Sequence, residues 1–537
     1  MNFIERAIKA VSPGWALSRE KARTNIVAQQ TRQAMASQMQ ASGLISGGSY
    51  RGVANADTME NWYTNNLTAN SALLPDVEVL RSRSLHLYRN SPAARGAVKT
   101  IAANVIGSGL LMRSTPDVTM LNMSAEEARA WANTAEREFE LWSEHPLSCD
   151  FNRKLTFSQI QRLANQSEQL SGDVFVLMPW VQRPGTEYEL KLQLIDAARV
   201  CNPNDMEDTE DIAGGIEYDP DTRIPVAIHI RTPHPGDQLS FHLPTWERIP
   251  YYGEKTGRLN VLHIMEHEYI DQARGEPGLA PVIEPLQQIT KYSQAELTAA
   301  VINAMMAVFI ERENPDELDT ESAYSDEKKE PAPRPDIQAG IWIEGAPGEK
   351  PQVLDPKRPS SQFDPFFTAT MKQIGMALEV PYEVLMKQFT NNYSASRAAL
   401  LEAWKAFKVR RDWLITTLCR PVYEAFLWEA VSKGVIHAPG FLESQRIRQA
   451  YCVARWVGPT QGQLDPVKEI TAANMKVESG FSTRTVEAAE QSGMDFEFIV
   501  TAQAQEQELC RKHGIQFGSV VFQPGVNPNE GGNSDDE

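Results

Sequence analysis

The chain passes from strand to helix within one stretch, HIMEHEYIDQARGEPGLAPVIEPLQQI (residues 263–289). The apolar pattern that enters it predicts a strand over residues 259–265. Helical periodicity begins at Val282 and predicts a helix to about Ile310, roughly 40 Å long at 1.5 Å per residue. Pro285 falls in the first turn of this helix, where proline is tolerated. The stretch therefore separates a strand-containing region from a mainly helical one.

Before this stretch the pattern predicts two helices and then several strands. The Ser-Pro pair at 91–92 is typical of a helix start, and Gly107 is typical of a helix end, so one helix is expected within residues 81–109. A second helix should begin at Ser124, because Glu127 follows it with the spacing of a capping box.

The strands are expected from residue 172 onward. Residues 174–180 are apolar, and residues 225–231 also fit a strand. In residues 190–194 leucine alternates with Lys191 and Gln193. This is the period of a half-buried strand, with the two polar side chains on its solvent face.

After the opening stretch, two helices flank an acidic insertion. Residues 311–330 hold nine acidic and three basic residues, and a Pro-rich segment with a short strand at 341–345 follows them. Helical periodicity returns at residues 363–379. Since the insertion at 311–360 is too short for a conventional domain core, the two helices and the insertion should form one hairpin-like excursion.

A polar loop, FTNNYS (389–394), then leads into a long helix that is expected to reach about Lys433. Small and aromatic residues recur along this helix at three- and four-residue spacing, which predicts one buried face. The basic residues would form a solvated face or contact another subunit: Arg397, Lys405, Lys408, Arg410 and Arg411. Residues 440–515 are expected to be helical, and the tail after them to be disordered.

Composition narrows the class of protein. The 537 residues allow roughly three or four domains. The formal net charge is -18, whereas a freely diffusing DNA-binding protein usually shows a basic patch.

Five scattered cysteines without a CxxC pair favour a reducing compartment. The sequence shows no secretory signal, and the longest apolar run, residues 297–310, is too short to span a bilayer.

One motif is considered as a catalytic site. His263, Glu266 and His267 fit the HxxEH pattern of inverted zinc proteases. That chemistry needs both histidines on one helical face. On a strand they would lie about 13 Å apart, too far for one zinc ion. A strand end with a surface turn is therefore the preferred interpretation, and no catalytic residue, metal or cofactor is predicted.

The order of segments resembles the lambda-type family of tailed-phage portal proteins. The similarity extends from about residue 60 to residue 505 and is carried by an ordered series rather than by one motif. Its segments are YRNSPAARGAVKTIAANVIGSGL (88–110), LIDAARVCNPND (194–205), residues 263–289 with Arg274-Gly275 placed as expected, FTNNYSASRAALLEAWKAFKVRR (389–411) and residues 456–506.

The resemblance implies an α+β, mostly helical portal fold with wing, stem, clip and crown parts that assembles into a ring, commonly of twelve subunits. The implied parts are a basic N-terminal arm (1–60), a mixed α/β wing (61–281), a first stem helix (282–310), the clip (311–360), a second stem helix (361–379), the tunnel loop (380–396), a long wing helix (397–435), a helical crown (436–515) and an acidic tail (516–537).

The resemblance also implies roles for particular residues. The tunnel loop would touch DNA in the channel through Lys387, Gln388, Asn391, Asn392 and Tyr393. The helix behind it would anchor the loop through Arg397, Trp404 and Phe407. The clip would present a partner surface that includes Asp316, Glu317, Asp319 and Glu321.

The implied function is a non-enzymatic ring at one capsid vertex, through which double-stranded DNA passes during packaging and ejection. Its partners would be further copies of the chain, the large terminase subunit, the major capsid protein, scaffold and the head-tail connector or neck proteins. It would be found in the virion and, during assembly, in the host cytoplasm. Two alternatives remain open from the sequence: a zinc-dependent hydrolase using residues 263–267, and a helical capsid-assembly scaffold without a channel.

Overall fold

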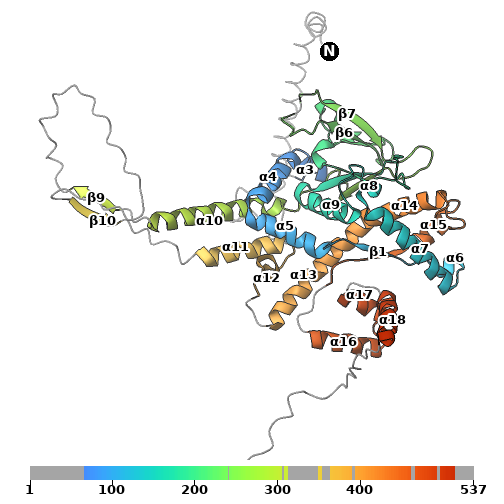
Figure 1. Ribbon diagram of the computed structural model, residues 1–537. Helices are drawn as coiled ribbons and strands as arrows, with labels where there is room; N and C mark the ends of the chain where they lie inside the picture. Colours follow the sequence, from blue (N-terminus) through green and yellow to red (C-terminus); the bar gives the residue numbers. More distant parts are fainter. Residues whose placement is uncertain are drawn as a thin grey trace, which may run out of the picture. The chain divides into compact units, whose positions relative to one another are not determined.

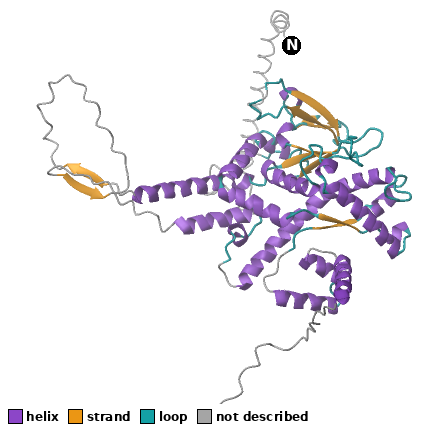
Figure 2. Ribbon diagram, viewed as in Figure 1, coloured by secondary structure: helices purple, strands orange, loops and turns teal. Residues whose placement is uncertain are grey.

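A computed structural model gives the fold, and it is mostly helical with several small sheets (Figures 1 and 2). The chain divides into two compact units, Met1–Thr68 and Ala69–Glu537. The structure describes residues 66–239, 241–304, 308–312, 349–353, 363–389, 393–460, 466–492 and 496–513. The helices and strands named below belong to the second unit. The N-terminal arm, most of the clip and the acidic tail lie outside the described residues.

The helix predicted within residues 81–109 is confirmed as α5 (Pro92–Val105), and a second helix, α4 (Val77–Asn90), precedes it. After a short α3 (Ala69–Leu73), α4 and α5 are separated by Ser91. Proline forces the residue before it out of the helical region, and Ser91 is accordingly extended, with φ -103° and ψ 117°. The predicted ends are confirmed, because Pro92 begins α5 and Gly107 follows it with φ 62°.

Capping boxes begin the next two long helices. A short α6 (Val118–Leu121) precedes α7 (Ala125–Ser143), and Ser124 and Glu127 form the predicted capping box at its start. A short α8 (Pro146–Cys149) leads to α9 (Phe157–Ser171), which begins with a second capping box made by Thr156 and Gln159. Both helices bury their apolar faces in the main core.

Two sheets follow, and they confirm the strand-containing region. The first has the order β3-β2-β8, with β2 (Asp173–Leu177), β3 (Gln193–Ile195) and β8 (Val261–Met265) all antiparallel. The second has the order β4-β5-β6-β7 and consists of β4 (Ile212–Ala213), β5 (Ile216–Tyr218), β6 (Pro225–Thr232) and β7 (Thr245–Pro250). Two 3-10 turns, Ala197–Arg199 and Pro203–Asp205, lie between the sheets in sequence.

The prediction for Lys191 is wrong. Its side chain is completely buried, and its Nζ donates to the carbonyl oxygens of Ser148 (2.7 Å) and Tyr188 (2.6 Å). Leu190 and Leu192 are buried as well, so this segment has no solvent face. Burial lowers the pKa of the lysine to about 8. Backbone carbonyls from neighbouring loops replace water around the ammonium group, which the alternating sequence pattern cannot reveal.

The first long helix after the sheets ends earlier than predicted. A 3-10 turn (Ala280–Val282) leads into α10 (Ile283–Ala304). Residues 308–310, expected at the end of this helix, instead belong to β9 (Val308–Arg312), which pairs antiparallel with β10 (Glu349–Val353). The valine, phenylalanine and isoleucine at 308–310 favour a strand once a partner strand is available. The predicted strand at 341–345 lies outside the described residues.

The return helix packs against α10. It is α11 (Phe363–Ala377), and Tyr292 of α10 contacts the rings of Phe363 and Phe366 at centroid distances of 5.4 and 5.1 Å. The two helices lie side by side and lead toward the β9–β10 pair (Figure 1). Both helices contribute buried residues to the main core: Leu286, Ile289 and Ile374.

The C-terminal region contains one strand that the sequence analysis missed. After a short α12 (Tyr382–Met386), α13 (Tyr393–Leu414), a π-helical turn (Ile415–Cys419) and α14 (Arg420–Ser432) form nearly continuous helix, which confirms the prediction to about Lys433. Beyond α15 (Gln445–Tyr451), however, β11 (Ala454–Val457) pairs antiparallel with β1 (Leu111–Ser114). Then come α16 (Pro466–Glu478), α17 (Arg484–Ser492) and α18 (Phe496–His513).

A buried ion cluster joins the sheet to the segment that leads into α10. Asp173 of β2 accepts from Arg274 (Nε, 2.6 Å), from Arg81 of α4 (2.9 Å) and from the backbone N–H of Gly275 (3.1 Å). A second N–H of Arg274 donates to the other carboxylate oxygen of Asp173 (3.1 Å), and the other three donate to backbone carbonyls, so all five of its donors are used. Those carbonyls belong to Ala197, Val200 and Gly214. Burial alone would raise the pKa of Asp173, but the two arginines hold it well below its usual range.

Two glycines allow the backbone to approach closely beside this cluster. A Cβ added to Gly275 would overlap the carbonyl group of Gly172, and a Cβ added to Gly172 would overlap that of Gly275. Gly172 also has φ +86°, a conformation that favours glycine. The cluster and the glycine contact together determine where the chain leaves β8 and begins the path to α10.

Gly275→Ala should therefore destabilise the protein by about 3 kcal/mol or more, because neither backbone segment can move without disturbing the ion cluster. Gly96→Ala is the matched control. A Cβ at Gly96 meets nothing within 4 Å, so alanine should stabilise α5 by about 0.5–1 kcal/mol. Chemical denaturation of the three proteins measures both effects, and equal stability of the Gly275 variant and the natural chain would contradict the packing described.

Candidate functional site

The connection between α11 and α13 contains a structured segment, α12, which ends in exposed residues at 387–389. Glu379 and Lys387 stand on either side of α12 with φ 56° and 55°, left-handed conformations that reverse the chain direction. The N–H of Val380 donates to the carbonyl of Gly375 (2.9 Å), and the N–H of Gln388 donates to that of Glu383 (3.0 Å). The backbone up to residue 388 is thereby fixed against α11.

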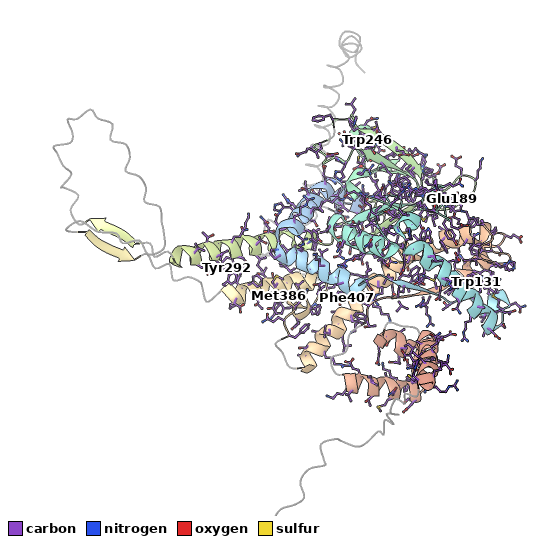
Figure 3. The ribbon with its side chains drawn as sticks, in the orientation of Figure 1. Trp131, Glu189, Trp246, Tyr292, Met386 and Phe407 are labelled. Atoms are coloured by element: carbon purple, nitrogen blue, oxygen red, sulfur yellow. The ribbon has the colours of Figure 1, made fainter. Side chains whose placement is uncertain are left out.

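Apolar packing holds α12 in place beneath the loop. Val384 and Leu385 are buried in the main core, and Met386 packs against the same core (Figure 3). Gly375 of α11 lets the chain pass closely, because a Cβ there would lie 2.6 Å from the carbonyl oxygen of Val380. These contacts make α12 a well-packed support for the residues that follow it.

The predicted loop residues fall in three different places. Lys387 and Gln388 are exposed at the end of α12, and their contact with DNA stays a prediction. Asn391 and Asn392 lie outside the described residues. Tyr393, expected in the loop, is instead the first residue of α13, since the helix begins three residues earlier than the loop boundary at 396 predicted.

The buried face of α13 agrees with the prediction from spacing. Ser396, Ala403 and Phe407 are buried, and Phe407 is only 3% exposed. Trp404 is half-buried and packs against the main core. Phe407 comes from α13 and lies against the body formed by α5 and α12 (Figure 3). These contacts fix the helix that follows the loop.

The basic face of α13 is less exposed than predicted. Arg411 is half-buried, and its guanidinium group donates to the carbonyl oxygens of Val105 (2.9 Å), Asn104 (2.9 Å) and Pro459 (3.1 Å). It also lies over the ring of Trp404, 5.0 Å from the centroid. Burial lowers the pKa of Arg411. The prediction of a solvated basic face is therefore wrong for Arg411.

Two other arginines of α13 also have acidic neighbours. Arg397, at the start of the helix, pairs with Glu469 of α16 at 2.8 Å. Arg410 lies near the carboxylates of Glu168 in α9 and of Glu266 after β8. Burial raises the pKa of Glu168, which is 4% exposed, to about 8, and Arg410 acts against that increase. Burial likewise raises the pKa of Glu266, again opposed by Arg410.

The zinc-protease pattern lacks the geometry that its chemistry requires. His263 lies on β8, as predicted, and its Nε2 is 3.1 Å from a carboxylate oxygen of Asp173. Its ring stacks on Phe175 at a centroid distance of 4.2 Å, and burial lowers its pKa. In the part of the chain that the structure describes, no group of three or more His, Cys, Asp or Glu side chains is arranged to hold a metal ion.

Other predicted site residues lie beyond the described ranges. Asp316, Glu317, Asp319 and Glu321 of the acidic insertion are among them, so their role as a partner surface stays a prediction. The described part of the same excursion consists of α10, α11 and the β9–β10 pair. Among the described residues, no helix is both long and apolar enough to cross a membrane.

Comparison with known proteins places the chain in a family. The model of a family described as phage portal protein, lambda family, matches residues 55–411. The chain belongs to the lambda family of phage portal proteins. The portal protein of Escherichia phage N15 is 25% identical over 496 residues, which cover 87% of this chain and 92% of that protein. Portal protein B of Escherichia phage lambda is 24% identical over 87% of this chain and 91% of its own length.

Two solved structures also match this portal-family chain. One is described as the virion of a native gene transfer agent particle, with a TM-score of 0.40 and 12% identity over 77% of this chain and 92% of the other. The other is described as the neck of a native particle of that kind computed with C12 symmetry, with a TM-score of 0.39 and 13% identity over 76% of this chain and 92% of the other. Proteins of the portal family are structural rather than catalytic.

The most important contacts that sequence reasoning missed are those of Arg411 and of the cluster around Asp173. One signal pointed to Arg274: the Arg274-Gly275 pair stands where the resemblance to portal proteins leads one to expect it. Arg411 had none, since its three carbonyl partners are more than 40 residues away in sequence.

Glu168→Gln should reduce the dependence of stability on pH. The folded state holds the proton of Glu168 up to about pH 8, whereas an unfolded chain releases it near its ordinary value of 4.5. Stability is therefore lost as pH rises between these values, and glutamine should stabilise the protein at pH 8 by ~1 kcal/mol or more. Melting temperatures at pH 5 and pH 8.5 measure this, with Glu140→Gln on the exposed side of α7 as control. An unchanged pH slope in Glu168→Gln would show that burial does not govern this carboxyl.

Proposed function

We propose that this chain forms a ring at one capsid vertex, through which double-stranded DNA enters during packaging and leaves during ejection. Membership of the portal family is the observation that carries this proposal. The geometry supports it: the helix pair α10 and α11 flanks a small β-pair in sequence, and α12, which packs against α11, ends in exposed residues at 387–389. In the family's terms these are the stem, the clip and the tunnel loop.

The charges of the chain suit a channel in which DNA must slide. A wall dense in lysine and arginine would displace counterions from many phosphates and hold the duplex tightly. The net charge of -18 opposes such binding. Lys387 and Gln388 are exposed at the loop base, and Asn391 and Asn392 follow them in sequence. One lysine per subunit with several neutral polar groups would guide DNA with little friction.

The helix pair carries apolar side chains that a ring would cover. Leu297 of α10 is 67% exposed and Met376 of α11 is 77% exposed. Val301 and Phe366 are also exposed on the same two helices. Large apolar residues repeated on one excursion favour contact with another protein surface. In a closed ring the partner surface is supplied by the next copy of the chain.

Other partners would bind other parts of the chain. The acidic insertion at 311–360 would meet the large terminase subunit during packaging and the neck proteins afterwards. The arm at 1–55, with seven basic and two acidic residues, would bind scaffold or the major capsid protein. Capsid incorporation of a chain that lacks the arm tests that last assignment, since unchanged incorporation would rule it out. The protein would reside in the virion after assembly in the host cytoplasm.

Deletion of residues 388–393 tests the channel role of the loop. The deletion leaves the buried residues of α12 and the core face of α13 in place, so rings should still form. We expect loss of packaged DNA or of its retention in filled heads, measured as nuclease-protected genome per particle. A control that replaces the same residues with a Gly-Ser segment of equal length separates chemistry from length. Normal packaging and retention in the deletion would remove the loop from the mechanism.

A further inference from the structure

The segment after β11 contacts α13 at two separate points. At one point Pro459 accepts a hydrogen bond from Arg411 (3.1 Å), and at the other Glu469 pairs with Arg397 (2.8 Å). Arg397 and Arg411 are separated by nearly four helical turns, about 21 Å along the axis, so they lie close to one face of the helix. The chain that leads into α16 therefore contacts both ends of this face of α13.

The contact at Arg411 is a joint of three segments. Its Nε and one terminal nitrogen donate to the carbonyls of Val105 and Asn104, which belong to the last turn of α5. Carbonyls in a last helical turn have no partner within the helix and carry the negative end of its dipole. A planar guanidinium group can satisfy several of them at once and still reach Pro459, which a lysine ammonium group cannot do with the same geometry.

Two glycines make the joint possible. A Cβ added to Gly458 would lie 2.8 Å from the Nε of Arg411 and 2.8 Å from a methyl carbon of Leu110. A Cβ added to Gly107, whose φ is +62°, would lie 2.8 Å from the ring of Pro459. The backbones after α5 and after β11 thus pass each other and the arginine with no room for a side chain. Trp404 covers the remaining face of the guanidinium group at 5.0 Å.

We propose that Arg411 is a positioning residue of the portal channel. It fixes α13 relative to both α5 and the segment that continues into α16–α18. Displacement of the C-terminal helices is thereby coupled to the start of α13, which directly follows the proposed tunnel loop. The inference rests on the proposed channel role of the loop only for its functional consequence, because the coupling itself is a property of the fold.

Hydrogen exchange in full-length assembled protein tests the coupling directly. Arg411→Gln removes the guanidinium group and its charge. Arg411→Lys keeps the charge but not the planar group that donates to several carbonyls, and Gly458→Ala crowds the arginine without changing it. We expect amides of residues 397–404 to exchange about fivefold faster or more in Arg411→Gln, the loss of roughly one net hydrogen bond, with a smaller increase in Arg411→Lys. Amides of β2 should exchange as in the natural protein.

Lys408→Gln is the matched control, because it makes the same charge change at an exposed position of the same helix. Equal exchange at residues 397–404 in Arg411→Gln and Lys408→Gln would overturn the proposal. If Arg411→Gln fails to assemble, Arg411→Lys and Gly458→Ala decide, and unchanged exchange in both would also overturn it.

Genome retention in particles separates this inference from the channel role of the loop. Arg411→Lys should lower retention in the same direction as loop deletion while ring assembly stays normal. Faster exchange in Arg411→Lys together with normal retention in the loop deletion would keep the coupling and reject the channel role. If amides of residues 397–404 exchange in Arg411→Lys as in the natural protein, while the loop deletion loses genome retention, the coupling is rejected and the channel role is kept.

Discussion

The carboxylate of Asp173 is the point on which the arrangement of the described fold depends. It receives Arg81 from α4, Arg274 from the segment before α10, His263 from β8 and the backbone of Gly275. A carboxylate without these partners would be very costly in a site with no solvent exposure. Because the donors come from three separate segments, α4, β8 and residues 274–275, the carboxylate can be satisfied only when all of them are in place.

The cluster has consequences for the parts proposed to act in the channel. Arg274 and Gly275 determine how the chain leaves the sheet, and α10 begins within ten residues of them. The path of α10 sets the position of α11, which packs on it, and α11 in turn supports α12 beneath the loop. In the proposal above, Arg411 holds the other side of this segment through α13. Arg274 is buried and Arg411 is half-buried, and their contacts lie on the two sides of the segment proposed to act in the channel.

Local signals in the sequence predict much of this fold. Pro92, Gly107 and the Ser124–Glu127 capping box mark helix ends correctly, because their effects depend on neighbours within four residues. The apolar spacing on α13 likewise identifies Phe407 as buried. The order of such segments was enough to indicate the portal family.

The errors concern residues whose partners are far away in sequence. Lys191 and Arg411 carry charges that usually face water. The carbonyl of Ser148 for Lys191, and those of the last turn of α5 for Arg411, are far away in sequence and help to explain their burial. The strand at 454–457 depends on pairing with residues 111–114, and the strand at 308–312 depends on pairing with residues 349–353. No periodicity within either short segment could indicate such a partner.

The ring is the central claim, and electron microscopy of the purified full-length protein tests it most directly. Two-dimensional class averages should show closed rings of about a dozen copies with an axial opening wide enough for duplex DNA. A monomer or a small closed oligomer that persists across salt and protein concentration would contradict the account.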